Sequence, residues 1–283
     1  MKRLLYILLA INFTTNCASA TERWAVVVGI SEYPTTSGWR SINGANDINL
    51  IVPALERCGF PAKNITTLSN SQATKQNIYN AIMQLTNKVR AGDVVYFHFS
   101  GHGQLVTDIN GDEKRETVGW DTAIIPYDAQ YKYNPNGYKG ENHIIDDELN
   151  TWMHKIKKAI GSSGRLLIVL DACHSGGGSR GGEDDEVKRG VSDKFVISQT
   201  TKQSTTPEYK IDWVCVSACK WTESNYEYKG YGRLSQAIAK VLKQSITAKQ
   251  LDKAIENEYS TMPNKFPQTA EIETDKIETY SVL

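Results

Sequence analysis

Runs of apolar residues alternate with amphipathic stretches along most of the chain. The run at 24–30 is continuously apolar and has a glycine at position 29, and the run at 165–170 is apolar after Arg165. Such runs are typical of strands that are buried on both faces of a parallel sheet. We expect strands at residues 24–30, 64–68, 93–100, 165–170, 213–217 and 269–273.

Helical patterns separate these strands. Ile78, Ile82, Leu85 and Val89 recur at intervals of three or four residues, which places them on one face of a helix. Strands that alternate with helices in this way build an α/β fold with a mostly parallel sheet covered on both faces. We expect helices at residues 44–57, 74–89, 145–160, 233–243 and 248–260.

The first twenty residues have the pattern of a secretory signal peptide. A basic start is followed by an apolar run at 4–13, too short to span a bilayer, and by small residues at 18–20. We expect residues 1–20 to be removed and the protein to be exported, periplasmic or secreted. A lipid anchor through Cys17 is the alternative, but Asn16 is larger than such a site normally allows.

Composition narrows the classes of function. The 283 residues carry 32 Lys and Arg against 32 Asp and Glu, so the chain lacks the positive charge of a nucleic-acid binder. A charged substrate must therefore be recognised by a local pocket. Four of the five cysteines lie beyond the signal, but a chain of this length needs no disulfide to fold.

Two short motifs follow predicted strands. Ser-Gly-His-Gly at 100–103 follows the strand at 93–100, and Asp-Ala-Cys-His-Ser-Gly at 171–176 follows the strand at 165–170. Ligands bind beyond the carboxyl ends of strands in open parallel sheets, so the cysteine and histidine of these motifs can meet there. Together they form a nucleophile and a base.

This pair of motifs resembles the caspase-like cysteine peptidases, most closely the metacaspases and their bacterial relatives. Further matching motifs lie at 44–47, 144–148 and 216–220, and the resemblance runs from about Trp24 to the C-terminus. True caspases carry Gln-Ala-Cys, so Asp171 in place of the glutamine points away from cleavage after aspartate.

The resemblance implies a caspase-like three-layer α/β/α sandwich for residues 21–283. Residues 21–178 would correspond to a large subunit and 211–283 to a small subunit. The segment 179–210 would be a linker or lid loop. The stretch from Ser175 to Lys210 is Gly-rich, then acidic, then basic at Lys188 and Arg189, and last Ser/Thr-rich, so a disordered surface insertion is the alternative.

The resemblance also implies the chemistry. Cys173 would attack a peptide carbonyl, His102 would carry the thiol proton to the leaving amine, and water would hydrolyse the thioester. The oxyanion hole would consist of the backbone N–H groups of Gly103 and Cys173. Cleavage of the chain itself at Lys188 or Arg189 is a further expectation.

The primary specificity pocket maps by resemblance onto Asp47, Ser100 and Asp171. Two carboxylates would bind Arg or Lys before the scissile bond and repel an acidic side chain. We therefore expect protein or peptide substrates with a basic residue there, and neither a nucleic-acid partner nor a membrane span. The structural alternatives are a helix N-terminal role for Asp47 and a strand-end hydrogen-bonding role for Asp171.

We expect no cofactor to be required, and calcium is the one that the resemblance suggests. The positions that match the metacaspase cluster are Asp128, Asp146 and Asp147, and hard oxygen ligands suit this ion. The family's further aspartate after the cysteine is not matched, because residues 178–180 are Gly-Ser-Arg. Asp146 and Asp147 fit a helix-capping role equally well.

Two alternatives to a hydrolase stay open at this point. A caspase-like fold could act as a binding or signalling module without significant proteolysis. A transpeptidase could use the same thioester, with an amine in place of water.

Overall fold

A six-stranded sheet forms the middle layer of the molecule. The computed structural model describes residues 20–111, 119–173, 187–197, 211–263, 266–275, 277 and 280–283. The strand order is β11-β8-β7-β3-β1-β2. The bounds are Arg23–Gly29 for β1, Ile65–Ser69 for β2, Val94–Ser100 for β3, Arg165–Asp171 for β7, Val214–Ser217 for β8 and Glu271–Glu273 for β11.

The sheet is parallel except at one edge. β1, β2, β3, β7 and β8 pair in parallel, and β11 pairs with β8 in the antiparallel direction. Strands predicted from apolar runs all occur within one or two residues of their expected bounds. Ser100 at the end of β3 lies opposite Asp171 at the end of β7, so the two motifs begin side by side.

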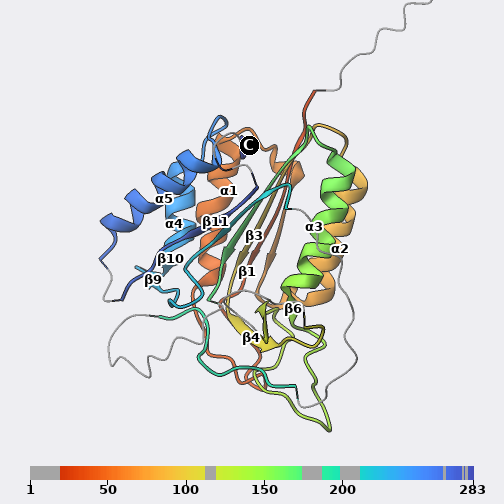
Figure 1. The fold of residues 1–283 in the computed structure, drawn as a ribbon, viewed down its shortest axis with the longest axis vertical. Helices are drawn as coiled ribbons and strands as arrows, with labels where there is room; N and C mark the ends of the chain where they lie inside the picture. The colour runs from red at the N-terminus through yellow and green to blue at the C-terminus, as the bar shows by residue number, and fades with distance from the viewer. Residues whose placement is uncertain are drawn as a thin grey trace, which may run out of the picture.

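Helices cover both faces of the sheet (Figure 1). Helices α2 and α3 lie on one face, and α1, α4 and α5 lie on the other. This arrangement confirms the expected three-layer sandwich, and the five helices match the periodic segments. Their bounds are Ile48–Arg57 for α1, Lys75–Lys88 for α2, Asp146–Ile160 for α3, Arg233–Val241 for α4 and Ala248–Thr261 for α5.

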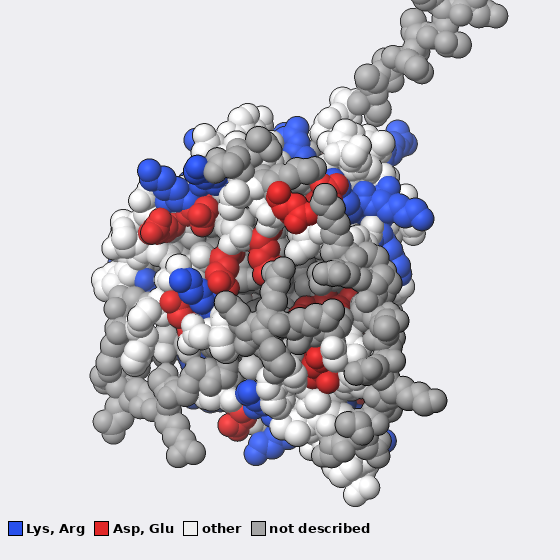
Figure 2. Space-filling view, viewed as in Figure 1, with Lys and Arg blue, Asp and Glu red and all other residues white. Residues whose placement is uncertain are grey.

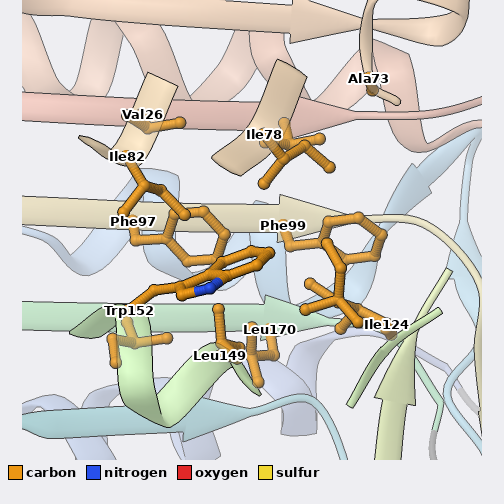
Figure 3. Packing of buried hydrophobic residues seen from close by; sticks show 14 of the residues in the cluster. Val26, Ala73, Ile78, Ile82, Phe97, Phe99, Ile124, Leu149, Trp152 and Leu170 are labelled. Atoms are coloured by element: carbon orange, nitrogen blue, oxygen red, sulfur yellow. The ribbon is translucent and has the colours of Figure 1, made fainter. Parts of the chain in front are cut away.

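One apolar cluster fills the space between the sheet and the α2–α3 layer. Figure 3 shows Ile78 and Ile82 of α2 and Trp152 of α3 packed over Phe97 and Phe99 of β3. All five side chains are buried. Removing apolar surface of this kind from water stabilises a fold by roughly 25 cal/mol per Å², so this layer holds β3 and its terminal motif in place.

Two small sheets lie at the end of the main sheet where the arrows of β1 and β3 finish (Figure 1). The first contains β4 (Gly103–Thr107), β5 (Trp120–Ile124) and β6 (Ile144–Ile145), and the second contains β9 (Glu227–Tyr228) and β10 (Tyr231–Gly232). None of these strands was predicted. They have two to five residues and lack a long apolar run. Whether such segments form strands depends more on the strands they pair with than on their own sequence.

The surface agrees with the balanced composition. Figure 2 shows basic and acidic side chains interspersed on one face, without a continuous basic area. Within the described residues, no helix is both long and apolar enough to cross a membrane.

Among the described residues, three histidines are buried and have pKa values far below the usual one. Burial lowers the pKa of His98 to about 4, that of His102 to about 4 and that of His143 to about 3. His98 lies between the hydroxyls of Tyr96 and Ser235, so both of its ring nitrogens have a partner inside the fold.

These histidines predict an acid-sensitive fold. Below pH 6.5 the unfolded chain binds protons that the folded chain does not accept until about pH 4 or 3, so stability is lost as the pH falls through this window. The free energy of unfolding should decrease from pH 6.5 to pH 5, with each histidine contributing up to about 1.4 kcal/mol per pH unit. Urea unfolding of the Cys173→Ala protein measures this slope. His143→Gln should reduce this slope by the contribution of about one proton. An unchanged slope would contradict the view that His143 contributes to the acid sensitivity.

Candidate active site

The predicted cysteine and histidine lie at the ends of adjacent strands. His102 follows β3 and Cys173 follows β7, each two residues beyond the paired Ser100 and Asp171. A hydrogen bond from Gly101 N to the Asp171 carbonyl, 3.3 Å long, holds the two turns together. Both reactive residues are buried. The sheet therefore brings together two residues that are 71 positions apart in the sequence.

The His102 ring is fixed by a carbonyl and by aromatic packing. Its Nε2 atom lies 2.8 Å from the carbonyl oxygen of Arg40, which can only accept a hydrogen bond, so Nε2 carries the proton. The ring stacks on Trp39 with 4.9 Å between centroids. Because burial lowers the pKa of His102 to about 4, the ring is neutral at pH 7.

The other ring nitrogen is then the basic one. Within the described part of the chain, Nδ1 of His102 is buried and has no hydrogen-bond partner. A neutral imidazole protonated on Nε2 carries its lone pair on Nδ1, which is the atom able to take a proton. Arg40 and Trp39 were not predicted as site residues, since a carbonyl group has no side-chain signature and a single aromatic residue has no motif.

A segment of the chain itself, residues 187–190, crosses the site beside residues 225–227. Arg189 N donates to the carbonyl of Asn225 at 3.0 Å, and Glu227 N donates to the carbonyl of Val187 at 2.8 Å. The backbone N–H of Cys173 donates to the carbonyl oxygen of Arg189 at 2.7 Å. The Arg189 carbonyl thus occupies the position where one of the two predicted oxyanion donors acts.

The residue after Arg189 touches the cysteine. A Cβ on Gly190 would lie 2.5 Å from Cys173 Cβ, 2.8 Å from the Cys173 carbonyl oxygen and 3.1 Å from the Gly103 carbonyl oxygen. Its φ of +148° also lies in the region that favours glycine. The structure therefore places the Arg189–Gly190 peptide against Cys173 and Gly103, at a spacing that only glycine fits.

The side chain of Arg189 fills the predicted acidic pocket. Its Nη1 atom lies 2.6 Å from Asp47 Oδ2 and 3.4 Å from Asp171 Oδ1, and it donates to Ser100 Oγ, which donates to Asp47. Asp47, Ser100, Asp171 and Arg189 are all fully buried. The three residues taken from the resemblance are thus brought together around one guanidinium group.

Two further residues complete the pocket. Glu227 Oε1 accepts from Arg189 Nε at 3.0 Å. A Cβ on Gly232 would overlap both Asp171 and the Arg189 guanidinium, so only glycine leaves room for the arginine. Sequence reasoning missed both residues. Glu227 and Gly232 lie in the short strands β9 and β10, and only the fold brings these strands to the pocket.

The pKa values of the two aspartates in the pocket are shifted in opposite directions. Burial raises the pKa of Asp47 above its usual value, although Arg189 opposes this. Burial would also raise the pKa of Asp171, but Arg189 and hydrogen bonds from Ser235 and Asn225 bring it below its usual value. The donors from Ser235 belong to the first turn of α4, whose positive end favours a carboxylate.

Cys219 is a second thiol beside the candidate nucleophile. Its Sγ donates to the Glu223 carbonyl at 3.6 Å, and Cys173 Sγ lies 3.9 Å from the same oxygen. The hydrogen bond with Cys173, together with burial, raises the pKa of Cys219 well above its usual value. Cys219 therefore stays protonated at neutral pH. Cys58, Cys173, Cys215 and Cys219 are all free thiols.

The three aspartates suggested for calcium each accept a hydrogen bond within the fold. Asp128 accepts from the Lys75 backbone, Asp146 from Thr122 and Asp147 from Asn110. Among the described residues, no group of three or more His, Cys, Asp or Glu side chains could hold a metal ion. Calcium binding therefore stays a prediction.

Several predicted features fall only partly within the described residues. Of the linker 179–210, residues 187–197 are described, and Phe195 of this segment is buried in the core. Lys188 pairs through its backbone with Tyr226, next to the buried Arg189. The signal peptide up to residue 19, Cys17 and the segments 174–186 and 198–210 lie outside the described residues.

The fold and the strand-end residues define a caspase-like α/β protein. The chain belongs to the Peptidase_C14 family, the caspase domain, which matches residues 22–276. This is a family of cysteine-type peptidases, and the resemblance inferred from the two motifs is confirmed.

Individual relatives agree with this membership. The chain is 32% identical to Metacaspase-1A of Aspergillus oryzae over 167 residues, which are 56% of this chain and 36% of that protein. It is 33% identical to Metacaspase-4 of Arabidopsis thaliana over 160 residues, 54% of this chain and 33% of that protein. The matches thus span about a third of the length of these curated relatives.

A solved structure shares the fold. The crystal structure of protein GSU0716 from Geobacter sulfurreducens superposes with a TM-score of 0.61, covering 89% of this chain and 92% of that one at 21% identity. At this identity the likeness concerns the fold alone.

The glycine at the end of the pocket provides a test of the Arg189 contacts. Gly232→Ala should displace the Arg189 side chain, because a methyl group there overlaps the guanidinium, and overpacking of this kind costs about 1–3 kcal/mol. In the Cys173→Ala background, trypsin should then cut after Arg189 roughly 5- to 150-fold faster. Mass spectrometry of the fragments measures the rate at this bond.

Gly137→Ala is the matched control, because its Cβ would meet only the side chain of Asn134. Equal trypsin rates after Arg189 in the Gly232 and Gly137 variants would contradict the packing described.

Proposed function

We propose that this protein is an exported cysteine endopeptidase that cleaves peptide bonds after basic residues. The observation that carries the proposal is the position of Arg189. Its side chain fills the acidic pocket, and its carbonyl oxygen accepts from the Cys173 backbone N–H at 2.7 Å. A substrate residue before a scissile bond would have this same geometry.

The proposed reaction uses Cys173 and His102. The thiol proton of Cys173 moves to Nδ1 of His102, and the thiolate sulfur attacks the carbonyl carbon. The resulting oxyanion is stabilised by backbone N–H groups, that of Cys173 among them. The carbon–nitrogen bond then breaks, and the His102 proton moves to the leaving amine. Water attacks the thioester, loses a proton to His102 and releases the acid as the carbon–sulfur bond breaks.

Burial favours a basic side chain in this pocket. Asp47, Asp171 and Glu227 lie around a single guanidinium and are shielded from water. Without a cation, their carboxylates would repel one another in a region of low dielectric. An acidic substrate side chain would add to that repulsion, whereas Arg or Lys relieves it.

The same geometry supports self-processing between Arg189 and Gly190. Arg189 occupies the pocket that an external substrate would need, so the uncut chain excludes other substrates. The close contact of Gly190 with Cys173 supports this proposal, because it concerns the residue that follows the Arg189–Gly190 peptide bond. We propose that cleavage of this bond precedes cleavage of other proteins.

A panel of fluorogenic peptides tests the activity. The processed protein should cleave substrates that end in Arg or Lys before the reporter, and it should not cleave the matching Asp substrate. Cys173→Ala and His102→Ala should each reduce kcat/KM by at least about 10³-fold, the scale seen when a catalytic dyad is broken. Preferential cleavage after Asp would refute the pocket assignment. Repeating the assay with EGTA examines calcium dependence, which stays a prediction.

Intact-mass analysis tests the self-processing. The wild-type chain should yield two fragments divided between Arg189 and Gly190, and Cys173→Ala should stay whole. Arg189→Ala should also prevent cleavage, because it removes the side chain that fills the pocket. Lys188→Ala is the matched control and should still be cut. Identical single masses for the wild type and Cys173→Ala would end this proposal.

A further inference from the structure

The Arg189 guanidinium is bound at two different depths of the pocket. At its tip, Nη1 contacts Asp47 and Asp171 at 2.6 and 3.4 Å. Nearer the backbone, Nε donates to Glu227 Oε1 at 3.0 Å. We infer that Glu227 makes this pocket select arginine over lysine. The inference rests on the proposed function in taking the Arg189 cavity as the substrate pocket.

Lysine lacks the donor that Glu227 accepts. Counted along the side chain, lysine has a methylene where arginine has Nε–H, and its ammonium nitrogen stands at about the position of the guanidinium carbon. All three of its N–H donors are on that one terminal atom. Lysine can therefore pair with Asp47 or Asp171, but it leaves a methylene against Glu227 Oε1. A desolvated carboxylate facing a methylene is unfavourable.

Hydrogen bonds fix the Glu227 carboxylate, so it cannot move to reach the ammonium group of a lysine. Its Oε1 also accepts from the Asn43 backbone N–H at 2.7 Å, and its Oε2 accepts from the Asn43 side chain. Its backbone pairs with Gly232 on β10 and with Val187 of the bound segment. Because both carboxylate oxygens are engaged in a buried position, the group is preorganised for an N–H at the Nε position.

The end of the pocket also fits a planar group. Gly232 leaves the space that Arg189 Nη1 and Cζ occupy, and any side chain there would overlap them. A guanidinium fills this space and reaches Glu227 and Asp47 at the same time. A single ammonium nitrogen cannot donate at both depths, so arginine gains a contact that lysine cannot make.

Binding to an emptied pocket tests this selection without requiring catalysis. The double variant Cys173→Ala/Arg189→Ala removes the resident side chain and prevents cleavage. The probes are Ac-Val-Lys-Arg-NH2, which copies residues 187–189, and Ac-Val-Lys-Lys-NH2, each titrated calorimetrically. The arginine peptide should bind about 10- to 100-fold more tightly, the range for a hydrogen bond to a charged group.

Two added substitutions separate the roles of the carboxylates. Glu227→Gln should weaken mainly the arginine peptide and reduce the ratio of the two affinities by about tenfold. Asp47→Asn should weaken both peptides and leave the ratio nearly unchanged, because the tip of either side chain reaches Asp47. A purely structural role for Glu227 would change both affinities together, so the ratio distinguishes the two explanations.

Three results would overturn the inference. They are equal affinity of the two peptides for the parent variant, equal weakening of both by Glu227→Gln, and no binding of either peptide. The proposed function fails separately, by absence of Cys173-dependent hydrolysis in the fluorogenic assay. Arginine preference in binding without hydrolysis would leave the inference standing and refute the enzyme.

Discussion

The burial of one guanidinium among three carboxylates organises the candidate active site of this protein. Asp47, Asp171 and Glu227 come from a 3₁₀ turn, a central strand and a small two-stranded sheet, and all of them contact Arg189. Burying charges is costly unless they are paired and hydrogen-bonded. Each of these groups therefore holds the others in place, and the elements that carry them are tied to a single point.

The three carboxylates outnumber the single guanidinium, so the charges in this cluster do not cancel. Neutral hydrogen-bond donors stabilise part of the excess negative charge. Gly232 N donates to Asp47, and Ser235 donates to Asp171 through both its backbone and its hydroxyl. Asn225 and Asn43 donate to Asp171 and Glu227. Oriented donors of this kind stabilise carboxylates without adding positive charge. The pocket is therefore built to hold negative charge, and it needs a cation to complete it.

Sequence patterns were sufficient to predict the sheet, the helices and the edge of the sheet where His102 and Cys173 lie. Long apolar runs and helical periodicity are local signals, and the strand-end motifs place His102 and Cys173 at one edge. The remaining site residues act through contacts that only the fold creates. Glu227 lies in a two-residue strand, Arg40 contributes only a carbonyl oxygen, and Gly232 matters for the space that it leaves. None of these has a periodic or motif signal.

The segment from Ser175 to Lys210 also shows what sequence patterns cannot predict. Its alternation of acidic, basic and Ser/Thr-rich stretches is compatible with a surface insertion, and Lys188 and Arg189 look equivalent in sequence. The structure separates the two residues by their burial. Arg189 is fully buried in the pocket, whereas Lys188 is only half-buried.

The pocket and the histidine are also linked electrostatically. Burial is the main cause that lowers the pKa of His102, and the positive charge of Arg189 lowers it further. A cation in the pocket thus favours the neutral ring, the form that can accept a proton from a thiol. The same guanidinium charge therefore completes the acidic pocket and adds to the effect of burial on the neighbouring His102 ring.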